Sequence, residues 1–274
     1  MNPLAAVVAL ALGGLFTPLA AHDEVRPAAR RRPDLAKILP RLYAPDSRAN
    51  QPRDEPAAAE AYFDRALRLA NGGRHESAIE SYKLALGLRP RWATAHFDLG
   101  WSYSQLGRWR EAAESCKQAV RFRPDFPEAH FLLGLSYAHT SQFKSAVKSY
   151  KRAIRYNPLY GDAYNNLGNV YIFQKKYRKA YDSYRQAISI DPDSADAHNG
   201  LGEAYRNLGQ LGDAVELYQE AIDRRPDYAL AYHNLGVTYA LLVRYEEAVQ
   251  AFRQAVHFNP HDTVARYNMG LVYV

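Results

Sequence analysis

Cysteine is almost absent from this sequence of 274 residues, which contains Cys116 alone. A single cysteine cannot form a disulfide within the chain or supply a cysteine-based zinc site. Catalytic motifs are also missing: there is no phosphate-binding loop and no nucleophile elbow, and Asp191, Asp193 and Asp196 lack the glycine and distal glutamate of a calcium loop. These absences argue against an enzyme and against any bound metal or cofactor.

The composition shows no extreme bias. Charged residues make up 23% of the chain and hydrophobic residues 47%, a balance that argues against a disordered, collagen-like or coiled-coil protein. The formal net charge is nevertheless +6. A positive excess makes nucleic acid or an anionic membrane a candidate partner, and the location of the basic residues in the fold decides between the two.

The N-terminal apolar segment has no Lys or Arg before it. Residues 3–21 are uncharged, and small residues precede the first charges, which follow Ala21. This pattern predicts a secretory signal peptide over residues 1–21, cleaved near Ala21, and therefore an exported protein in the periplasm or outside the cell. The alternative is an uncleaved inner-membrane anchor over residues 3–21, although nineteen residues at 1.5 Å each extend only about 28 Å.

Residues 22–58 are rich in proline and arginine. The arginines include the run from Arg30 to Arg32, and the prolines of this segment are Pro27, Pro33, Pro40, Pro45, Pro52 and Pro56. Proline at this density prevents helix propagation, and few apolar residues are available for a core. The sequence predicts a flexible linker here.

The rest of the chain follows a period of thirty-four residues. The repeating prolines are Pro90, Pro124, Pro158, Pro192, Pro226 and Pro260, and the repeating glycines are Gly100, Gly134, Gly168, Gly202, Gly236 and Gly270. Tyrosine follows each glycine by three residues, from Tyr103 to Tyr273, and alanine follows by twelve, from Ala112 to Ala248. Such a period is the signature of a repeat architecture.

These positions match the W-x2-L-G-x2-Y, A-x3-F and terminal Pro pattern of the tetratricopeptide repeat (TPR), so the sequence resembles a TPR protein over about four-fifths of its length. The resemblance implies an all-α, right-handed solenoid of helix-turn-helix units over residues 59–274. The units are 59–92, 93–126, 127–160, 161–194, 195–228 and 229–262, with a partial unit 263–274.

Each unit should fold as two antiparallel helices that pack closely through glycine and alanine at the eighth and twentieth positions. Gly73, Gly107 and Gly209 should adopt the left-handed conformation that closes the first helix. Cys116 stands where other units have an aromatic residue, which predicts a core position rather than a nucleophile. Packing likewise explains the fourth-position histidines better than metal ligation: these are His96, His130 and His198.

The second, sixth, ninth and thirteenth positions of the first helices should face the concave groove of the solenoid. These positions contain seven carboxylates, and none contains Lys or Arg: the acids are Glu60, Asp64, Asp98, Glu128, Asp162, Asp196 and Glu203. A groove of this kind should repel a phosphate backbone, which argues against nucleic acid. Trp101 and neighbouring apolar residues could form pockets for a ligand's side chains or pack between helices.

Asparagine is frequent on the same face and at the neighbouring fifth position: these residues are Asn165, Asn166, Asn169, Asn199, Asn207, Asn234 and Asn268. Because an Asn side chain both donates and accepts hydrogen bonds, a ladder of them can bind the backbone of an extended peptide. The run from Tyr164 to Asn169 resembles units in the repeat superhelix of O-linked N-acetylglucosamine transferases. Asparagine at the sixth position is also common in TPR units whatever they bind, so both interpretations stay open.

Basic residues should instead lie on the convex back, where they form a stripe along the second helices. The stripe consists of Arg110, Lys117, Arg121, Lys144, Lys148, Lys151, Arg155, Arg178 and Arg185. It is either a solvated outer face or a contact surface for anionic lipid or nucleic acid.

Together these patterns predict a non-enzymatic protein-interaction scaffold that binds an extended peptide or partner protein in its groove. Chaperone-tail binders of this family use a carboxylate clamp, but no unit here has Lys or Arg at the fifth or sixth position. One alternative is the recognition module of a larger enzyme, such as a glycosyltransferase, that continues past Val274. A second is peripheral membrane association through the convex stripe; nothing in the sequence indicates an oligomeric state.

Overall fold

The computed structural model describes residues 55–272, and this part of the chain is helical throughout, with short turns between helices. The predicted signal segment, the linker up to residue 54 and residues 273–274 lie outside the described residues. The helices are α3 (Glu55–Asn71), α4 (His75–Leu88), α5 (Ala93–Gln105), α6 (Trp109–Phe122), α7 (Pro127–His139), α8 (Phe143–Tyr156), α9 (Gly161–Phe173), α10 (Tyr177–Ile190), α11 (Ala195–Asn207), α12 (Leu211–Arg224), α13 (Ala229–Leu241), α14 (Tyr245–Phe258) and α15 (Thr263–Val272).

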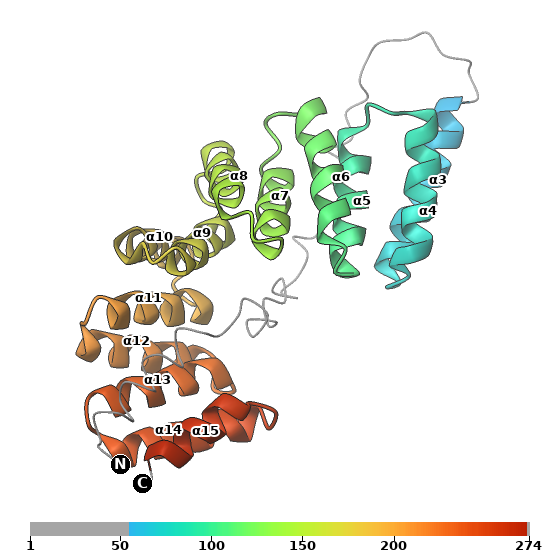
Figure 1. Cartoon of the computed structure of the whole chain (residues 1–274). Helices are drawn as coiled ribbons and strands as arrows, with labels where there is room; N and C mark the ends of the chain where they lie inside the picture. The colour runs from blue at the N-terminus through green and yellow to red at the C-terminus, as the bar shows by residue number, and fades with distance from the viewer. Residues whose placement is uncertain (1–54, 273–274) are drawn as a thin grey trace.

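These helices stack as antiparallel pairs into a curved solenoid, which confirms the predicted fold class (Figure 1). The first helices of neighbouring units contact one another along the stack. Within residues 55–272, the second helices of neighbouring units do not contact one another. The first helices therefore form the inner, concave side of the curve, and the second helices form the outer side.

The first helix begins earlier than the repeat register predicts. The sequence pattern places residues 55–58 in the linker, but α3 already starts at Glu55. Pro56 lies in the first turn, where its missing N–H group costs no helical hydrogen bond, and alanines follow it. The proline that suggested a linker is thus compatible with a helix start.

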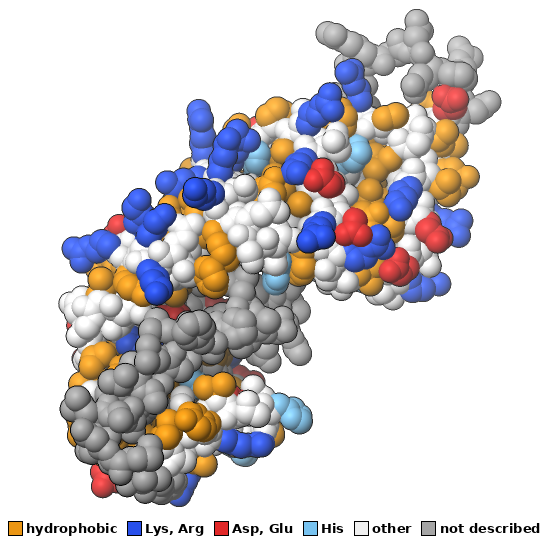
Figure 2. Space-filling model, in the orientation of Figure 1, with side chains coloured by type: hydrophobic (Ala, Val, Ile, Leu, Met, Phe, Trp, Pro, Cys, Tyr) orange, Lys and Arg blue, Asp and Glu red, His pale blue; other side chains and the backbone are white. Residues whose placement is uncertain are grey.

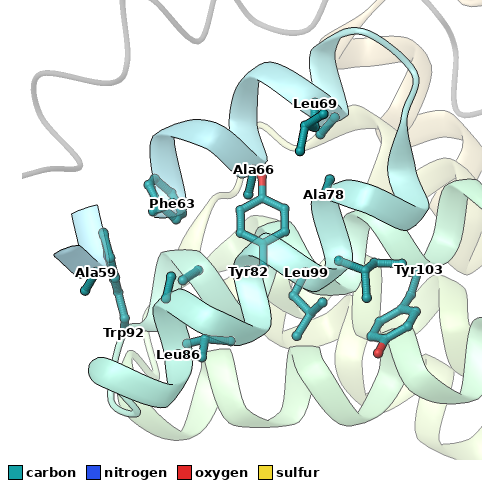
Figure 3. Close-up of a cluster of buried hydrophobic side chains, with 14 of the residues drawn as sticks. Ala59, Phe63, Ala66, Leu69, Ala78, Tyr82, Leu86, Trp92, Leu99 and Tyr103 are labelled. Carbon is teal, nitrogen blue, oxygen red and sulfur yellow. The ribbon is translucent and has the colours of Figure 1, made fainter. Parts of the chain in front are cut away.

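The core of each unit forms where the second helix places a large side chain against the eighth position of the first. Tyr150, Tyr184, Tyr218 and Phe252 are completely buried and lie against the glycine of their own unit. In the first unit Ala66 replaces that glycine, and Tyr82 of α4 extends toward it (Figure 3). Cys116 occupies the same site in the second unit and is fully buried, and burial raises the pKa of its thiol. Its predicted core position is confirmed.

The turn inside each unit needs a residue with positive φ at the fifteenth position. Gly73, Gly107 and Gly209 adopt φ values of 74°, 69° and 82°, as predicted. The same conformation is adopted by non-glycine residues in the other units, namely Ser141, Lys175 and Val243. For a β-branched residue such as Val243, at φ 63°, this conformation is strained.

Val243→Gly is expected to raise the free energy of unfolding by about 1 kcal/mol. Relief of the strain contributes roughly 1–3 kcal/mol, and the greater conformational entropy of glycine in the unfolded chain offsets part of this gain. Little packing is lost, since Val243 is 63% exposed. Urea unfolding followed by circular dichroism measures the change. Val243→Ala is the control: it retains a Cβ and should recover only part of the gain. Equal stability of all three proteins would show that the valine is unstrained.

Candidate functional site

The inner face, defined by the second, sixth, ninth and thirteenth positions of the first helices, is accessible in some units and closed in others. Glu60, Asp64, Glu128 and Asp162 are exposed. The asparagines separate into two groups. Asn165, Asn166, Asn169 and Asn207 are half-buried on α9 and α11, whereas Asn199, Asn234 and Asn268 are only 5%, 7% and 1% exposed.

The accessible asparagines are oriented by the protein itself. The Nδ2 group of Asn166 donates to the Asp162 carbonyl at 2.9 Å, and that of Asn207 donates to the Glu203 carbonyl at 2.8 Å. The Tyr184 hydroxyl donates to Asn169 Oδ1 at 2.7 Å. Each bond fixes one end of the amide and leaves the other end for a further hydrogen bond.

The buried asparagines connect units instead of lining an open surface. Asn234 Nδ2 on α13 donates to Asn199 Oδ1 on α11 at 3.0 Å. The predicted ladder is therefore not one continuous row of accessible amides. Its accessible part is confined to α9 and α11, and the Asn199–Asn234 bond is a contact between neighbouring first helices.

The prediction of a groove without basic residues is wrong. Arg225 contacts Asp196 through two hydrogen bonds of 3.1 and 2.8 Å, and Tyr228 donates to the same carboxylate at 2.8 Å. Two further ion pairs lie on this face: Arg206 with Glu203 at 3.7 Å, and Arg89 with Glu60 at 4.0 Å. Arg89 and Arg225 follow the second helix of their unit, so a projection of the first helix alone could not include them.

An arginine recurs at the thirty-first position of three units, and it was not recognised from the sequence as part of the inner face. Arg89, Arg123 and Arg225 share the thirty-first position, and their guanidinium groups lie over the rings of Trp92, Phe126 and Tyr228. The signal was available in the sequence as an Arg-x-x-aromatic pattern at the period of the prolines. These cation–π pairs hold the inter-unit turn against the inner face.

On the inner face, Glu128 of α7 and Asp162 of α9 have no ion-pair partner among the described residues. In the described part of the chain, neither Glu128 nor Asp162 forms an ion pair within 4.0 Å of Lys, Arg or His, although Arg123 lies near Glu128. Partial burial raises the pKa of Asp162, and the neighbouring carboxylates of Asp191 and Asp196 raise it further. Removing solvent from this carboxylate is unfavourable unless a cation or donor accompanies the change.

Several inner-face residues of α5 and α7 are partly buried by packing against neighbouring side chains. Trp101 is half-buried and packs on a cluster that contains Leu132, Leu133 and Leu135. The last inner residue of α7, His139, stacks on Trp109 at a centroid distance of 3.8 Å. Asp98, also on this face, is half-buried.

The fourth-position histidines have partners within the protein. His96 and His130 place Nε2 2.8 Å from the carbonyls of Pro90 and Pro124, while His198 lies 3.2 Å from the Glu220 carboxylate. Among residues 55–272, no three His, Cys, Asp or Glu side chains cluster as a metal site would require. No helix in this range is both long and apolar enough to cross a bilayer.

The predicted basic stripe lies on the outer side of the second helices. Arg110, Arg121, Lys144, Lys148, Lys151, Arg155, Arg178 and Arg185 are exposed, and Lys117 is half-buried. Lys117 forms an ion pair with Glu114 at 2.6 Å.

Comparisons with known proteins agree with this architecture. Family models described as TPR repeat match residues 137–174 and 168–209, and models described as tetratricopeptide repeat match residues 47–91, 97–155 and 199–263. The chain therefore belongs to the tetratricopeptide-repeat family, whose members are in general protein-interaction scaffolds. No curated protein matches it significantly.

Solved structures of other repeat proteins superimpose on the chain. A crystal structure of MamA protein is 30% identical, with a TM-score of 0.58 over 63% of this chain and 94% of its own. YrrB, titled a TPR protein with an unusual peptide-binding site, is 21% identical with a TM-score of 0.56, over 69% and 97%. A tetratricopeptide repeat protein from Parabacteroides merdae is 16% identical with a TM-score of 0.61, over 80% and 100%. The latter two show the shared fold.

Proposed function

We propose that this chain is a scaffold that holds an extended polypeptide along the inner face of α7, α9 and α11. The observation that supports the proposal is the set of oriented amides on Asn166, Asn169 and Asn207. A peptide in an extended conformation presents alternating N–H and C=O groups, which such amides can bind whatever the peptide's sequence. Because the amides are already oriented, less entropy is lost on binding.

The charge on this face indicates what else the peptide should contain. Glu128 and Asp162 occupy the same position in consecutive units, and neither forms an ion pair in the described structure. A Lys or Arg side chain of the peptide would neutralise them and relieve the repulsion among Asp162, Asp191 and Asp196. We therefore propose a basic, extended segment of another protein as the ligand, and a location outside the cytoplasm on the strength of residues 1–21.

A selection from a displayed library of linear peptides, made against the full chain, tests the proposal. We expect the selected peptides to be enriched in Lys and Arg. Replacing Asn166, Asn169 and Asn207 together by alanine should weaken their binding roughly a hundredfold, at about 1 kcal/mol for each hydrogen bond lost. Fluorescence anisotropy with a selected peptide measures the change. Asn234 is left out of the set because its bond to Asn199 belongs to the fold.

The matched control removes three exposed amides from the outer side: Gln186, Gln250 and Gln254 are each replaced by alanine. Binding should then be unchanged, and helicity should be the same in both triple variants. Equal affinity of the inner triple variant, the outer triple variant and the wild type would contradict the proposal.

A further inference from the structure

The outer side of the third and fourth units has an unusual surplus of positive charge. We define the outer basic face as Lys144, Lys148, Lys151, Arg152 and Arg155 on α8, together with Lys175, Lys176, Arg178, Lys179 and Arg185 on and before α10. All ten side chains are exposed, and Asp182 is the one acidic residue on these two helices. Residues 129–161 contain no Asp or Glu at all.

Within the described structure these ten cations form no ion pair. The hydrogen bonds they do form go to neutral groups: Lys176 donates to Gln174, and Arg185 donates to the hydroxyl of Tyr181. Ten like charges, eight on these two helices and two in the turn before α10, repel one another, and Asp182 is the one acidic residue of the two helices. Such a surface gains most from a dense layer of external anions.

The face has clear borders along the stack. On α6, Glu111 and Glu114 form ion pairs with Arg108 and Lys117 at 2.9 and 2.6 Å, which leaves only Arg110 and Arg121 among the basic residues of that helix without an ion pair in the described structure. On α12 the outer side is acidic, with Asp213, Glu216, Glu220 and Asp223 exposed. Figure 2 shows Lys and Arg side chains gathered over the part of the stack where Figure 1 places α8 and α10. The charge is thus a local property of two units.

The extended shape of the outer basic face suits a broad anionic surface better than a single small anion. Each helix has fourteen residues, a length of about 21 Å. The lysines and arginines project along both helices, so an extended layer of phosphate groups can meet all of them at once. A single small anion could contact only a few.

Apolar side chains at the edge of the face favour lipid over nucleic acid. Leu159, in the turn after α8, is 75% exposed, and Tyr156, beside Arg155, is exposed while its ring stacks on His130. An exposed aliphatic side chain next to basic residues suits insertion between headgroups, whereas it cannot stack on a base. Membrane anchoring through residues 3–21, the alternative to a cleaved signal, would also place the chain beside anionic lipids.

From these observations we propose that the outer basic face binds the phosphodiester headgroups of an anionic membrane. The inner face, on the opposite side of the same units, would then point away from the bilayer and stay open to a polypeptide. The two proposals concern different residues, so an experiment can refute either one and leave the other standing.

Sedimentation of the full chain with vesicles tests the proposal. The vesicles are pure phosphatidylcholine or phosphatidylcholine mixed with phosphatidylglycerol. Binding should require phosphatidylglycerol and weaken as the salt concentration rises. Replacing Lys148, Lys151, Arg155 and Arg178 by glutamine should lower the partition coefficient about a hundredfold or more, since each basic residue near an anionic surface strengthens binding roughly fivefold.

The matched control replaces Arg65, Arg68, Lys83 and Arg91 by glutamine, which changes the net charge equally but at exposed sites on the first unit. It should retain full binding. An equal loss in both variants would overturn the proposal in favour of net charge alone. Equal binding to neutral vesicles would overturn it in favour of the apolar N-terminal segment, which every variant retains. Stronger binding to single-stranded RNA, or sedimentation without vesicles, would point to nucleic acid or to a second copy.

Discussion

Gly200→Ala is expected to lower the free energy of unfolding by about 2 kcal/mol, the middle of the range for an overpacked core. Tyr184 of α10 lies between two glycines, Gly168 on α9 and Gly200 on α11. A Cβ on Gly200 would lie 2.5 Å from Cζ of that ring, and a Cβ on Gly168 would lie 2.8 Å from it. Because Tyr184 is only 1% exposed, its ring has no space to move into.

Gly168→Ala should have a similar effect. The double variant should lose less stability than the two single variants added together, because displacing the Tyr184 ring once makes room for both Cβ atoms. Gly212→Ala on α12 is the control. A Cβ there meets no atom within 4 Å, so alanine should raise stability by up to about 1 kcal/mol through helix propensity. Urea unfolding followed by circular dichroism measures all four variants. A stabilising Gly200→Ala would show that the ring can be displaced at no cost.

Two tyrosines at the same repeat position should respond in opposite directions to loss of the hydroxyl. Tyr150→Phe should stabilise the protein by about 1 kcal/mol, because the Tyr150 hydroxyl is buried without a hydrogen-bond partner in the described structure. Tyr184→Phe should destabilise it by about 1 kcal/mol, because it removes the bond to Asn169.

The difference arises from the ninth position of the same unit, which is Asn169 beside Tyr184 and Leu135 beside Tyr150. The urea midpoints of the two phenylalanine variants should therefore shift to opposite sides of the wild type. Tyr184→Phe should also weaken peptide binding modestly, since the amide of Asn169 is no longer held in place. If both variants shift the midpoint in the same direction, the hydroxyl groups do not decide stability at this position.

Much of the fold follows from spacing alone. Glycine at the eighth position and an aromatic residue at the twenty-fourth meet in the core of the third to sixth units, and the period of thirty-four sets both. The start of α3 was harder to predict, because Pro56 argues against a helix interior but is compatible with a first turn. The left-handed Ser141, Lys175 and Val243 were also missed, since none of them prefers that conformation.

The candidate site was less predictable because its contacts join residues from different helices. A projection of the first helices places Asn169 on the inner face, but it cannot show that Tyr184, fifteen residues later, already holds its oxygen. Nor can it show that Asn234 and Asn199 bond to each other across units, or that Arg225 neutralises Asp196. The first and third of these pairs depend on how the two helices and the turn of one unit pack together, and the Asn199–Asn234 pair depends on the angle between neighbouring units; a projection of single helices contains neither.

Neighbouring units are joined by two sets of contacts: each second helix packs on the first helix of the next unit, and first helices touch one another, whereas the described second helices do not pair directly. Mechanically, this makes the chain a spring whose outermost helices are connected only through the first helix that lies between them. Small rotations between units add up to a large change in pitch. A tighter coil spreads α8 and α10 apart and dilutes the positive charge over a larger area, whereas a straighter coil brings those helices together.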